Sequence, residues 1–153
     1  MTSSPRLFLR SVLVFLALPG VVAIVVPGIV LRPGETPANP IGLAVLAIGF
    51  VLLLWCVRDF YVAGKGTLAP WSPPRHLVVV GLYRYSRNPM YVAVLLMLAG
   101  WAIAYASAIL WLYAAAVAVL FHLRVRLHEE PFLARTHGAA WESYQAAVPR
   151  WLR

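Results

Sequence analysis

Four stretches of the chain are apolar enough to be membrane-spanning helices. The first, residues 11–31, holds no charged residue and, at about 1.5 Å per residue, can cross a hydrocarbon core of about 30 Å. A second span is predicted at residues 41–57, after a loop rich in proline. Residues 91–123 contain no Asp, Glu, Lys or Arg, and we expect two spans there, at about 90–105 and 107–124. The predicted fold class is therefore all-α, a polytopic membrane helix bundle of about four transmembrane helices.

The apolar region 91–123 also allows one long helix, and the distribution of charge separates the two arrangements. With two spans, both termini lie on the same side of the membrane as the loop 58–90. That side then carries every basic residue except Arg32, in agreement with the positive-inside rule. A single long helix would put the basic loop and the basic C-terminus in opposite compartments. We therefore predict an integral, multi-pass membrane protein with cytoplasmic N and C termini.

Two polar segments connect and follow the predicted spans. Residues 58–89 form a long connector. Loops of this length are usually functional or disordered, and the aromatic residues of this one favour function. Residues 128–153 mix charged and apolar side chains at roughly helical spacing, which predicts an amphipathic helix at the membrane interface. Arg6 and Arg10 precede the first span as in a signal peptide, but its apolar run is longer than the usual h-region of about 7–15 residues, so we expect a retained span. The whole chain is predicted to form one membrane-embedded domain.

Composition supports the membrane assignment and limits the partners. Of the 153 residues, 62% are hydrophobic and only 12% are charged, about half the charged share of a soluble domain. The net charge of +8 indicates attraction to anionic lipid head groups rather than binding to nucleic acid. Cys56 is the single cysteine and the four histidines lack ligand spacing, so no metal site is expected. Gly42, Gly49 and Gly100 allow close helix contacts, but the sequence leaves the oligomeric state open.

Two short polar stretches flank the last two predicted spans. The one before residue 90 contains Gly81, Tyr83, Arg87, Pro89 and Tyr91. The one after residue 124 contains Glu129, Glu130 and Leu133, followed by Tyr144, Val148 and Pro149. With four spans, both stretches lie at the same membrane surface. Adjacent carboxylates at a membrane boundary are costly unless they are solvated or partnered, so this surface is the place to expect chemistry.

These stretches resemble the signature of the isoprenylcysteine carboxyl methyltransferase and phospholipid methyltransferase superfamily. The family pattern runs G-x-Y-x-x-x-R-H-P-x-Y, then a helical hairpin, then E-E-x-x-L and a terminal Y-x-x-Y-x-x-x-V-P segment. The match covers about residues 75–153, half of the chain. The resemblance implies a membrane-embedded methyltransferase that uses S-adenosylmethionine, releases S-adenosylhomocysteine, and methylates a lipophilic small molecule or a lipid. An isoprenylcysteine carboxylate, a phospholipid amine and a thiol all stay open as acceptors.

The resemblance also implies a set of site residues. Its cofactor contacts fall on Arg75, His76, Leu77, Val78, Tyr83, Asn88, Pro89, Met90, Tyr91 and Glu129. Asn88 stands where the isoprenylcysteine enzymes carry a His; it keeps a donor and an acceptor but cannot handle a proton in the same way. The substrate-side Arg of the family falls on Val125, and we expect the neighbouring Arg126 to substitute. Arg126 and Glu130 are the predicted catalytic residues.

The chemistry of the cofactor agrees with these residues. S-adenosylmethionine carries a sulfonium, an ammonium and a carboxylate. Glu129 suits the ammonium, an Arg can clamp the carboxylate, and Tyr83 or Tyr91 can stack on the adenine or face the sulfonium. Methyl transfer by in-line displacement needs alignment rather than a metal. A dry pocket helps because the sulfonium charge is dispersed in the transition state.

Two other classes of function compete with a methyltransferase. Sterol-reductase-type enzymes use NADPH and share part of the turn, but Met90 and Val94 replace their Asn and Glu. A non-enzymatic membrane scaffold that keeps the fold is the other alternative, since Asn88 and Val125 depart from the family pattern.

Overall fold

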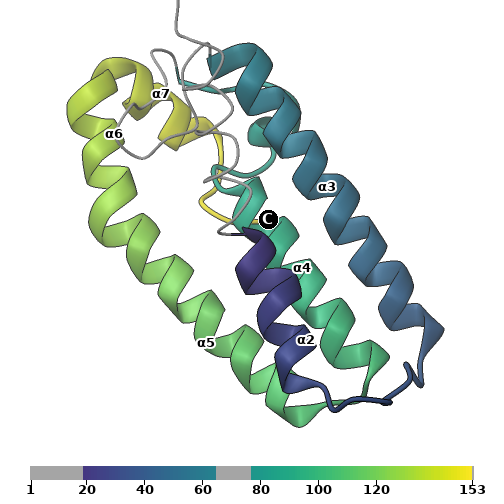
Figure 1. Ribbon diagram of the computed structural model, residues 1–153. Coiled ribbons are helices and arrows are strands. Elements are labelled where there is room, and N and C mark those ends of the chain that lie inside the picture. The colour runs from purple at the N-terminus through teal and green to yellow at the C-terminus, as the bar shows by residue number, and fades with distance from the viewer. Residues whose placement is uncertain (1–18, 65–76, 153) are drawn as a thin grey trace, which may run out of the picture.

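The computed structural model describes residues 19–64 and 77–152, and every regular element in these two ranges is a helix (Figure 1). The all-α fold class is confirmed for this part of the chain. The first half contains the π-helix η1 (Val21–Val25), α2 (Val26–Val30) and α3 (Pro40–Gly64). The second half contains the 3₁₀ helix η2 (Gly81–Arg84), α4 (Pro89–Ala104), α5 (Ala108–Arg124), the π-helix η3 (Val125–Glu129), α6 (Glu130–His137) and α7 (Ala139–Ala147).

The apolar region 91–123 forms two helices that run antiparallel, α4 and α5 (Figure 1). The break comes at Ala106, which has a positive φ of 49°. Ser107 then caps α5, because its hydroxyl oxygen accepts from the backbone N–H of Leu110 at 3.4 Å. The backbone N–H groups of Ala38 and Asn39 donate to the carbonyl of Ala104 at 2.8 and 3.1 Å, so the loop before α3 closes the end of α4.

Two described helical stretches are long and apolar enough to cross a membrane, Pro40–Asp59 and Ala108–His137. The apolar stretches Val21–Val30 and Pro89–Ala104 are shorter. Residues 11–18 of the predicted first span lie outside the described residues. Four crossings with cytoplasmic termini therefore stay a prediction.

The C-terminal region differs from the single amphipathic helix expected over residues 128–153. Its first part continues the line of α5 through η3 into α6, and the chain then turns at Gly138, whose φ is +50°. Beyond this turn α7 folds back toward the bundle and ends before Val148, which has an extended backbone. A glycine in a conformation that other residues rarely adopt explains why one helix became two.

Three glycines bring α3 and α4 into backbone contact. A Cβ atom at Gly42 would overlap the backbone of Ala104, and one at Gly100 would lie 2.5 Å from the backbone nitrogen of Leu46. A Cβ atom at Gly49 would lie 2.8 Å from Met97. Small residues at such crossings are typical of helix pairs in lipid, where close packing is a main source of association energy.

Pro27 explains the π-helix at the start of the described chain. The nitrogen of Pro27 has no hydrogen to give the carbonyl of Ala23, and the N–H of Val26 bonds to Val21 instead of Val22. Two carbonyls are thereby left without a helical partner. Trp101 donates its indole N–H to Ala23 at 2.8 Å, and the hydroxyl of Tyr113 donates to Val22 at 3.0 Å. Side chains of α4 and α5 thus satisfy the carbonyls that the proline frees.

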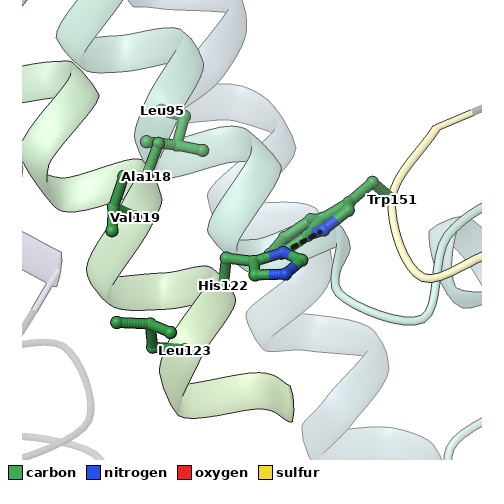
Figure 2. A pocket seen from close by; sticks show the side chains of 6 residues that line it. All are labelled: Leu95, Ala118, Val119, His122, Leu123 and Trp151. Atoms are coloured by element: carbon green, nitrogen blue, oxygen red, sulfur yellow. Dashed lines mark hydrogen bonds between the residues drawn. The ribbon is translucent and has the colours of Figure 1, made fainter.

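An apolar groove of about 400 Å³ lies between α4 and α5 (Figure 2). Its lining combines aliphatic side chains with one imidazole and one indole: Leu95, Ala118, Val119, His122, Leu123 and Trp151. The indole N–H of Trp151 donates to Nδ1 of His122 at 3.3 Å, and the two rings stack with centroids 6.2 Å apart. An indole can only donate, so Nδ1 of His122 is the acceptor and the neutral ring carries its proton on Nε2.

We predict that Trp101→Phe lowers the free energy of unfolding by about 1–3 kcal/mol, because the carbonyl of Ala23 loses its donor in an apolar setting. Unfolding in detergent micelles, followed by circular dichroism, measures this loss. Trp111→Phe is the matched control, since Trp111 is an exposed residue of α5. Equal stability of the two variants would show that the indole bond to Ala23 contributes nothing.

Candidate functional site

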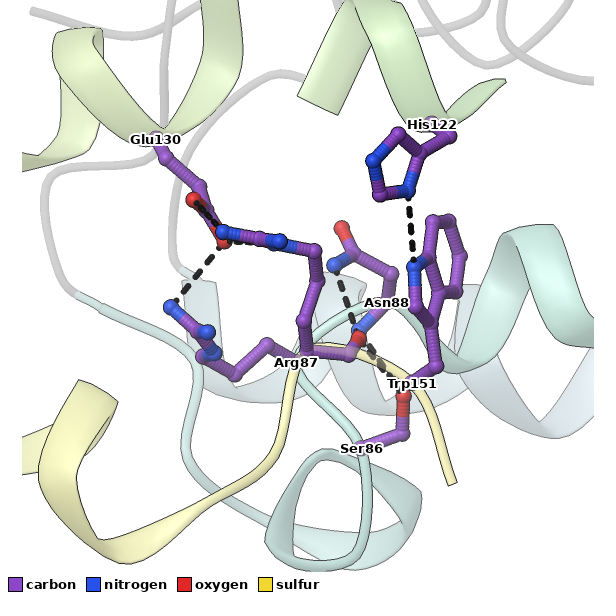
Figure 3. Close-up of polar contacts among 7 residues, drawn as sticks. Ser86, Arg87, Asn88, His122, Glu130 and Trp151 are labelled. Atoms are coloured by element: carbon purple, nitrogen blue, oxygen red, sulfur yellow. Dashed lines mark hydrogen bonds and ion pairs between the residues drawn. The ribbon is translucent and has the colours of Figure 1, made fainter. Parts of the chain in front are cut away.

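A buried ion-pair cluster joins the connector, the start of α6 and the C-terminal segment (Figure 3). Arg150 donates to Glu130 in a bidentate manner, from Nε to Oε1 and from Nη2 to Oε2, both at 2.8 Å. Nη1 of Arg87 lies 3.1 Å from the same Oε1 as an ion pair without hydrogen-bond geometry. The side chains of Arg87 and Glu130 are only 8% and 13% exposed. This burial makes the cluster one cooperative unit rather than a set of surface pairs.

The environment of the two guanidinium groups differs. Burial lowers the pKa of Arg87, and the positive charge of Arg150 adds to this while Glu130 opposes it. The hydrogen bonds to Glu130 raise the pKa of Arg150. The guanidinium carbon of Arg87 also lies 5.3 Å from the ring centroid of Trp141, as a cation–π contact. Glu130 and Trp141 therefore offset the cost of burying the charge of Arg87.

The turn before α4 is hydrogen-bonded to the C-terminal segment. The backbone N–H of Arg87 donates to the carbonyl of Pro149 at 2.9 Å. The carbonyl of Arg150 accepts from the amide of Asn88 at 3.0 Å and from the hydroxyl of Ser86 at 3.3 Å (Figure 3). The hydroxyl of Ser86, in turn, accepts from the backbone N–H of Asn88 at 3.1 Å. Asn88 thus fixes the C-terminal segment against the start of α4.

A second polar group, the Glu129 triad, consists of Tyr91, Arg124 and Glu129. The hydroxyl of Tyr91 donates to Oε1 of Glu129 at 2.5 Å, and Nε of Arg124 donates to the same oxygen at 2.8 Å. Nε of Arg124 also lies 3.2 Å from the hydroxyl of Tyr91. The ring of Tyr91 packs on Phe121, with centroids 4.3 Å apart. Glu129 is partly exposed, so this triad can meet a ligand.

The π-helix η3 makes the triad. In it, the N–H of Glu130 reaches back five residues to the carbonyl of Val125. A π turn brings residues five apart onto one face, and Arg124 and Glu129 are five apart. The turn comes directly before Pro131, which has no N–H with which to continue the α-helical pattern. Short π segments inside α-helices occur frequently at functional sites.

Also near the α4 N-terminus lies an apolar group formed by Cys56, Val78 and Tyr83, with Leu82 and Met90 packed against it. Burial raises the pKa of Tyr83 well above its usual value, so its hydroxyl stays protonated. The hydroxyl of Tyr144 donates to the carbonyl of Tyr83 at 2.7 Å. Burial also raises the pKa of Tyr144, to about 12. Met90 belongs to this group and Tyr91 to the Glu129 triad, so the two groups adjoin at the start of α4.

The family model described as phospholipid methyltransferase matches residues 38–140, which include α3, α4, α5 and most of the polar residues above. The chain belongs to the phospholipid methyltransferase family. This family lies within the isoprenylcysteine carboxyl methyltransferase-like superfamily, as the sequence pattern indicated. No significant match to the chain is found among curated proteins or among solved structures. Membership in the phospholipid methyltransferase family makes the chain a membrane methyltransferase in general terms.

The structure gathers most of the residues that the resemblance assigns to the cofactor. Val78, Tyr83 and Met90 pack in the apolar group, and Tyr91 and Glu129 form the triad. Asn88 is the N-cap residue of α4, and Pro89 is its first residue. Leu77 instead packs against Trp141, Tyr144 and Val148. Arg75 and His76 lie outside the described residues.

The two predicted catalytic residues have different surroundings. Both oxygens of Glu130 accept from Arg150, so its carboxylate is occupied by the protein itself. The side chain of Arg126 is exposed and, among the residues that the structure describes, pairs with no carboxylate. Val125, where the resemblance places an Arg, is buried, and Arg124 is the arginine that reaches Glu129. The sequence motif did not predict Arg124, Ser86 or Arg150 as site residues. Arg124 lies five residues before Glu129, so sequence spacing would place the two side chains together only if a π turn were assumed.

We expect Glu130→Gln to lower the free energy of unfolding by about 3 kcal/mol, because it leaves Arg87 buried without a counter-charge. Tryptophan fluorescence during unfolding in detergent reports this, since Trp141 and Trp151 lie near the cluster. Glu142→Gln removes an exposed carboxylate of α7 and should change stability by less than about 0.5 kcal/mol. A Glu130→Gln protein as stable as this control would contradict a structural role for the cluster.

Proposed function

We propose that the chain is a four-span membrane methyltransferase that uses S-adenosylmethionine and methylates a lipophilic acceptor. The observation that carries the proposal is that the Glu129 triad and the apolar group around Tyr83 meet at the α4 N-terminus, through Tyr91 and Met90. Membership in the phospholipid methyltransferase family supports methyl transfer. The donor and the acceptor follow from the chemistry of the site.

The side chains present fit the functional groups of S-adenosylmethionine. The cofactor has a flat adenine, ribose hydroxyls, a carboxylate, an ammonium and a sulfonium. Aromatic rings of Tyr83 and Tyr91 offer stacking surfaces. Arg124 is more than half exposed and uses Nε for Glu129, which leaves its other donors for a carboxylate. Oε1 of Glu129 is taken by Tyr91 and Arg124, and Oε2 can accept from the ammonium or from ribose hydroxyls.

When bound, this cofactor supplies a methyl group on a positively charged sulfur. The protein's part is to align donor and acceptor and to keep water out. Asn88 contributes by fixing the C-terminal segment beside the start of α4, and Glu130 contributes by holding Arg87 and Arg150 behind it. In this proposal Glu130 is a positioning residue. Arg126, exposed on the same π-helix, stays a proposed substrate-side residue.

The groove between α4 and α5 supports a lipophilic acceptor. Its aliphatic walls suit a hydrocarbon chain, and a volume of about 400 Å³ is at the lower end of ligand pockets, which favours one chain over two. His122, held by Trp151, keeps its proton on Nε2 and can donate to an oxygen of the acceptor. Large apolar side chains are exposed along the outer faces of α3 and α5, including Ile48, Val51, Leu112 and Leu120, as a lipid environment requires.

The proposed topology puts the loop before α3 and the C-terminal helices on opposite sides of the membrane. In a Cys56→Ala background, Thr36→Cys should react with a membrane-impermeant maleimide in intact cells. Ser143→Cys, in α7, should react only after the cells are permeabilised. Identical labelling of the two variants in intact cells would contradict the four-span arrangement with cytoplasmic termini.

Titration calorimetry of the detergent-purified protein with S-adenosylhomocysteine tests the cofactor. We expect saturable binding by the wild type and at least a tenfold weaker affinity for Glu129→Ala, because Arg124 and Tyr91 lose their shared acceptor. Glu142→Ala, which removes an exposed carboxylate elsewhere, should bind as the wild type does. If the folded wild type binds nothing, a non-enzymatic membrane scaffold becomes the better account.

A further inference from the structure

Asp59 is a buried carboxylate that the proposed function has not used. It lies near the C-terminal end of α3 and is only 6% exposed. Its Oδ1 meets Nη1 of Arg58 at 3.3 Å, but the Arg58 side chain is 73% exposed, so this pair contributes little. Its Oδ2 is buried and, in residues 19–64 and 77–152, has no hydrogen-bond partner. A buried carboxylate oxygen without a donor is costly and needs an explanation.

The carboxylate occupies a space that Gly81 leaves open. Gly81 has a positive φ of 56°, and a Cβ atom there would overlap Oδ2 of Asp59. Gly81 is the first residue of η2, the short helix that carries Tyr83. The glycine of the G-x-Y motif therefore serves two needs at once: it makes the turn, and it admits the carboxylate beside the apolar group.

The surroundings of Asp59 are those of the expected cofactor pocket. Asp59 is one of the groups whose negative charge, after burial itself, raises the pKa of Tyr83. Tyr83 packs with Val78 and Met90, so the unpartnered oxygen, next to Gly81, adjoins a group that holds three residues the resemblance gives to the cofactor. No group of three or more His, Cys, Asp or Glu that could hold a metal occurs in the described part of the chain. An organic cation suits this oxygen better than a metal ion does.

We propose that Oδ2 of Asp59 binds the ammonium group of the methyl donor. The inference rests on the proposed use of S-adenosylmethionine. An ammonium brings three N–H donors and so satisfies the unpartnered oxygen, whereas a sulfonium brings none. A carboxylate beside the sulfonium would also stabilise the charge of the ground state, which the transition state disperses, and would slow the reaction. Glu129, with Oε1 already taken by Tyr91 and Arg124, is then left to the ribose hydroxyls.

A purely structural task for Asp59 would be to cap η2. The carboxylate lies at the N-terminal end of that helix, where N–H groups lack helical partners. Yet Oδ2, the oxygen that faces Gly81, accepts from no donor among the described residues, so it does not cap η2 in the structure. The two roles predict different effects of removing the charge of Asp59. Loss of a helix cap lowers the stability of the fold, whereas loss of an ammonium site weakens the binding only of ligands that carry an ammonium.

The test compares two ligands with the full-length protein in detergent. S-adenosylhomocysteine carries the ammonium, and 5′-methylthioadenosine lacks both the ammonium and the carboxylate. Asp59→Asn keeps the shape of the side chain and removes its charge. We expect this variant to lose about ten- to a hundredfold in affinity for S-adenosylhomocysteine, while its affinity for methylthioadenosine stays within about twofold of the wild type. Glu142→Gln, the same change on the surface, should alter neither.

Any other result contradicts the proposed role of Asp59, and the pattern of the result shows why. Equal affinity of Asp59→Asn and wild type for S-adenosylhomocysteine removes Asp59 from the site but leaves the proposed function intact. Parallel losses for both ligands make Asp59 a structural residue, and thermal unfolding of the variant would then show the same defect. If the wild type binds neither ligand, the proposed function itself fails. Should Asp59→Asn not fold, Asp59→Glu, which keeps the charge but displaces it, must show a loss confined to S-adenosylhomocysteine.

Discussion

Two guanidinium groups, from Arg87 and Arg150, share the carboxylate of Glu130 at the end of the bundle where three distant segments meet. The connector, the helix that continues α5 and the C-terminal segment also share the apolar contacts of Leu77 and Leu133 with Trp141 and Val148, and the charges add to these contacts. Because Arg87 and Glu130 are almost fully buried, Glu130 cannot be removed without leaving Arg87 buried and unpaired. The turn of Ser86 and Asn88, and the first turn of α4 after it, take their position from this cluster.

Adjacent glutamates perform different tasks because of the helix they share. Glu130 points into the ion-pair cluster, while Glu129 meets Tyr91 and Arg124. The π turn of η3 makes this separation by adding one residue to the turn. As a result, the carboxylate of Glu130 is fully paired within the protein, whereas under the proposed function Glu129 still has one oxygen that can accept from a ligand. A regular α-helix would set Glu129 above Val125, which is apolar and buried.

The sequence predicts the helices better than it predicts their ends and side-chain partners. Apolar runs and charge asymmetry indicated separate helices within 91–123, and the structure has them, although the break at Ala106 has neither glycine nor proline at its centre. The motif spacing predicted that Tyr83, Asn88 and Glu129 lie at one end of the bundle, and the structure has them there; their role as a site stays a prediction. It could not select Arg124 over Arg126, because spacing arguments assume α-helical periodicity. Pairs such as Glu130 with Arg150 depend on tertiary folding and obey no local spacing rule.

The close packing of α3 on α4 is what connects the rest of the bundle to the candidate site. Gly42, Gly49 and Gly100 let the two backbones touch, and side chains at such a contact have little freedom to shift. Asp59 stands on α3 beyond this contact, and Tyr91 stands on the first turn of α4. If both groups hold one small ligand, as proposed above, they need a fixed separation, since even a displacement of about 1 Å weakens alignment strongly. A backbone contact through glycine supplies that rigidity in a protein whose outer faces are otherwise left to lipid.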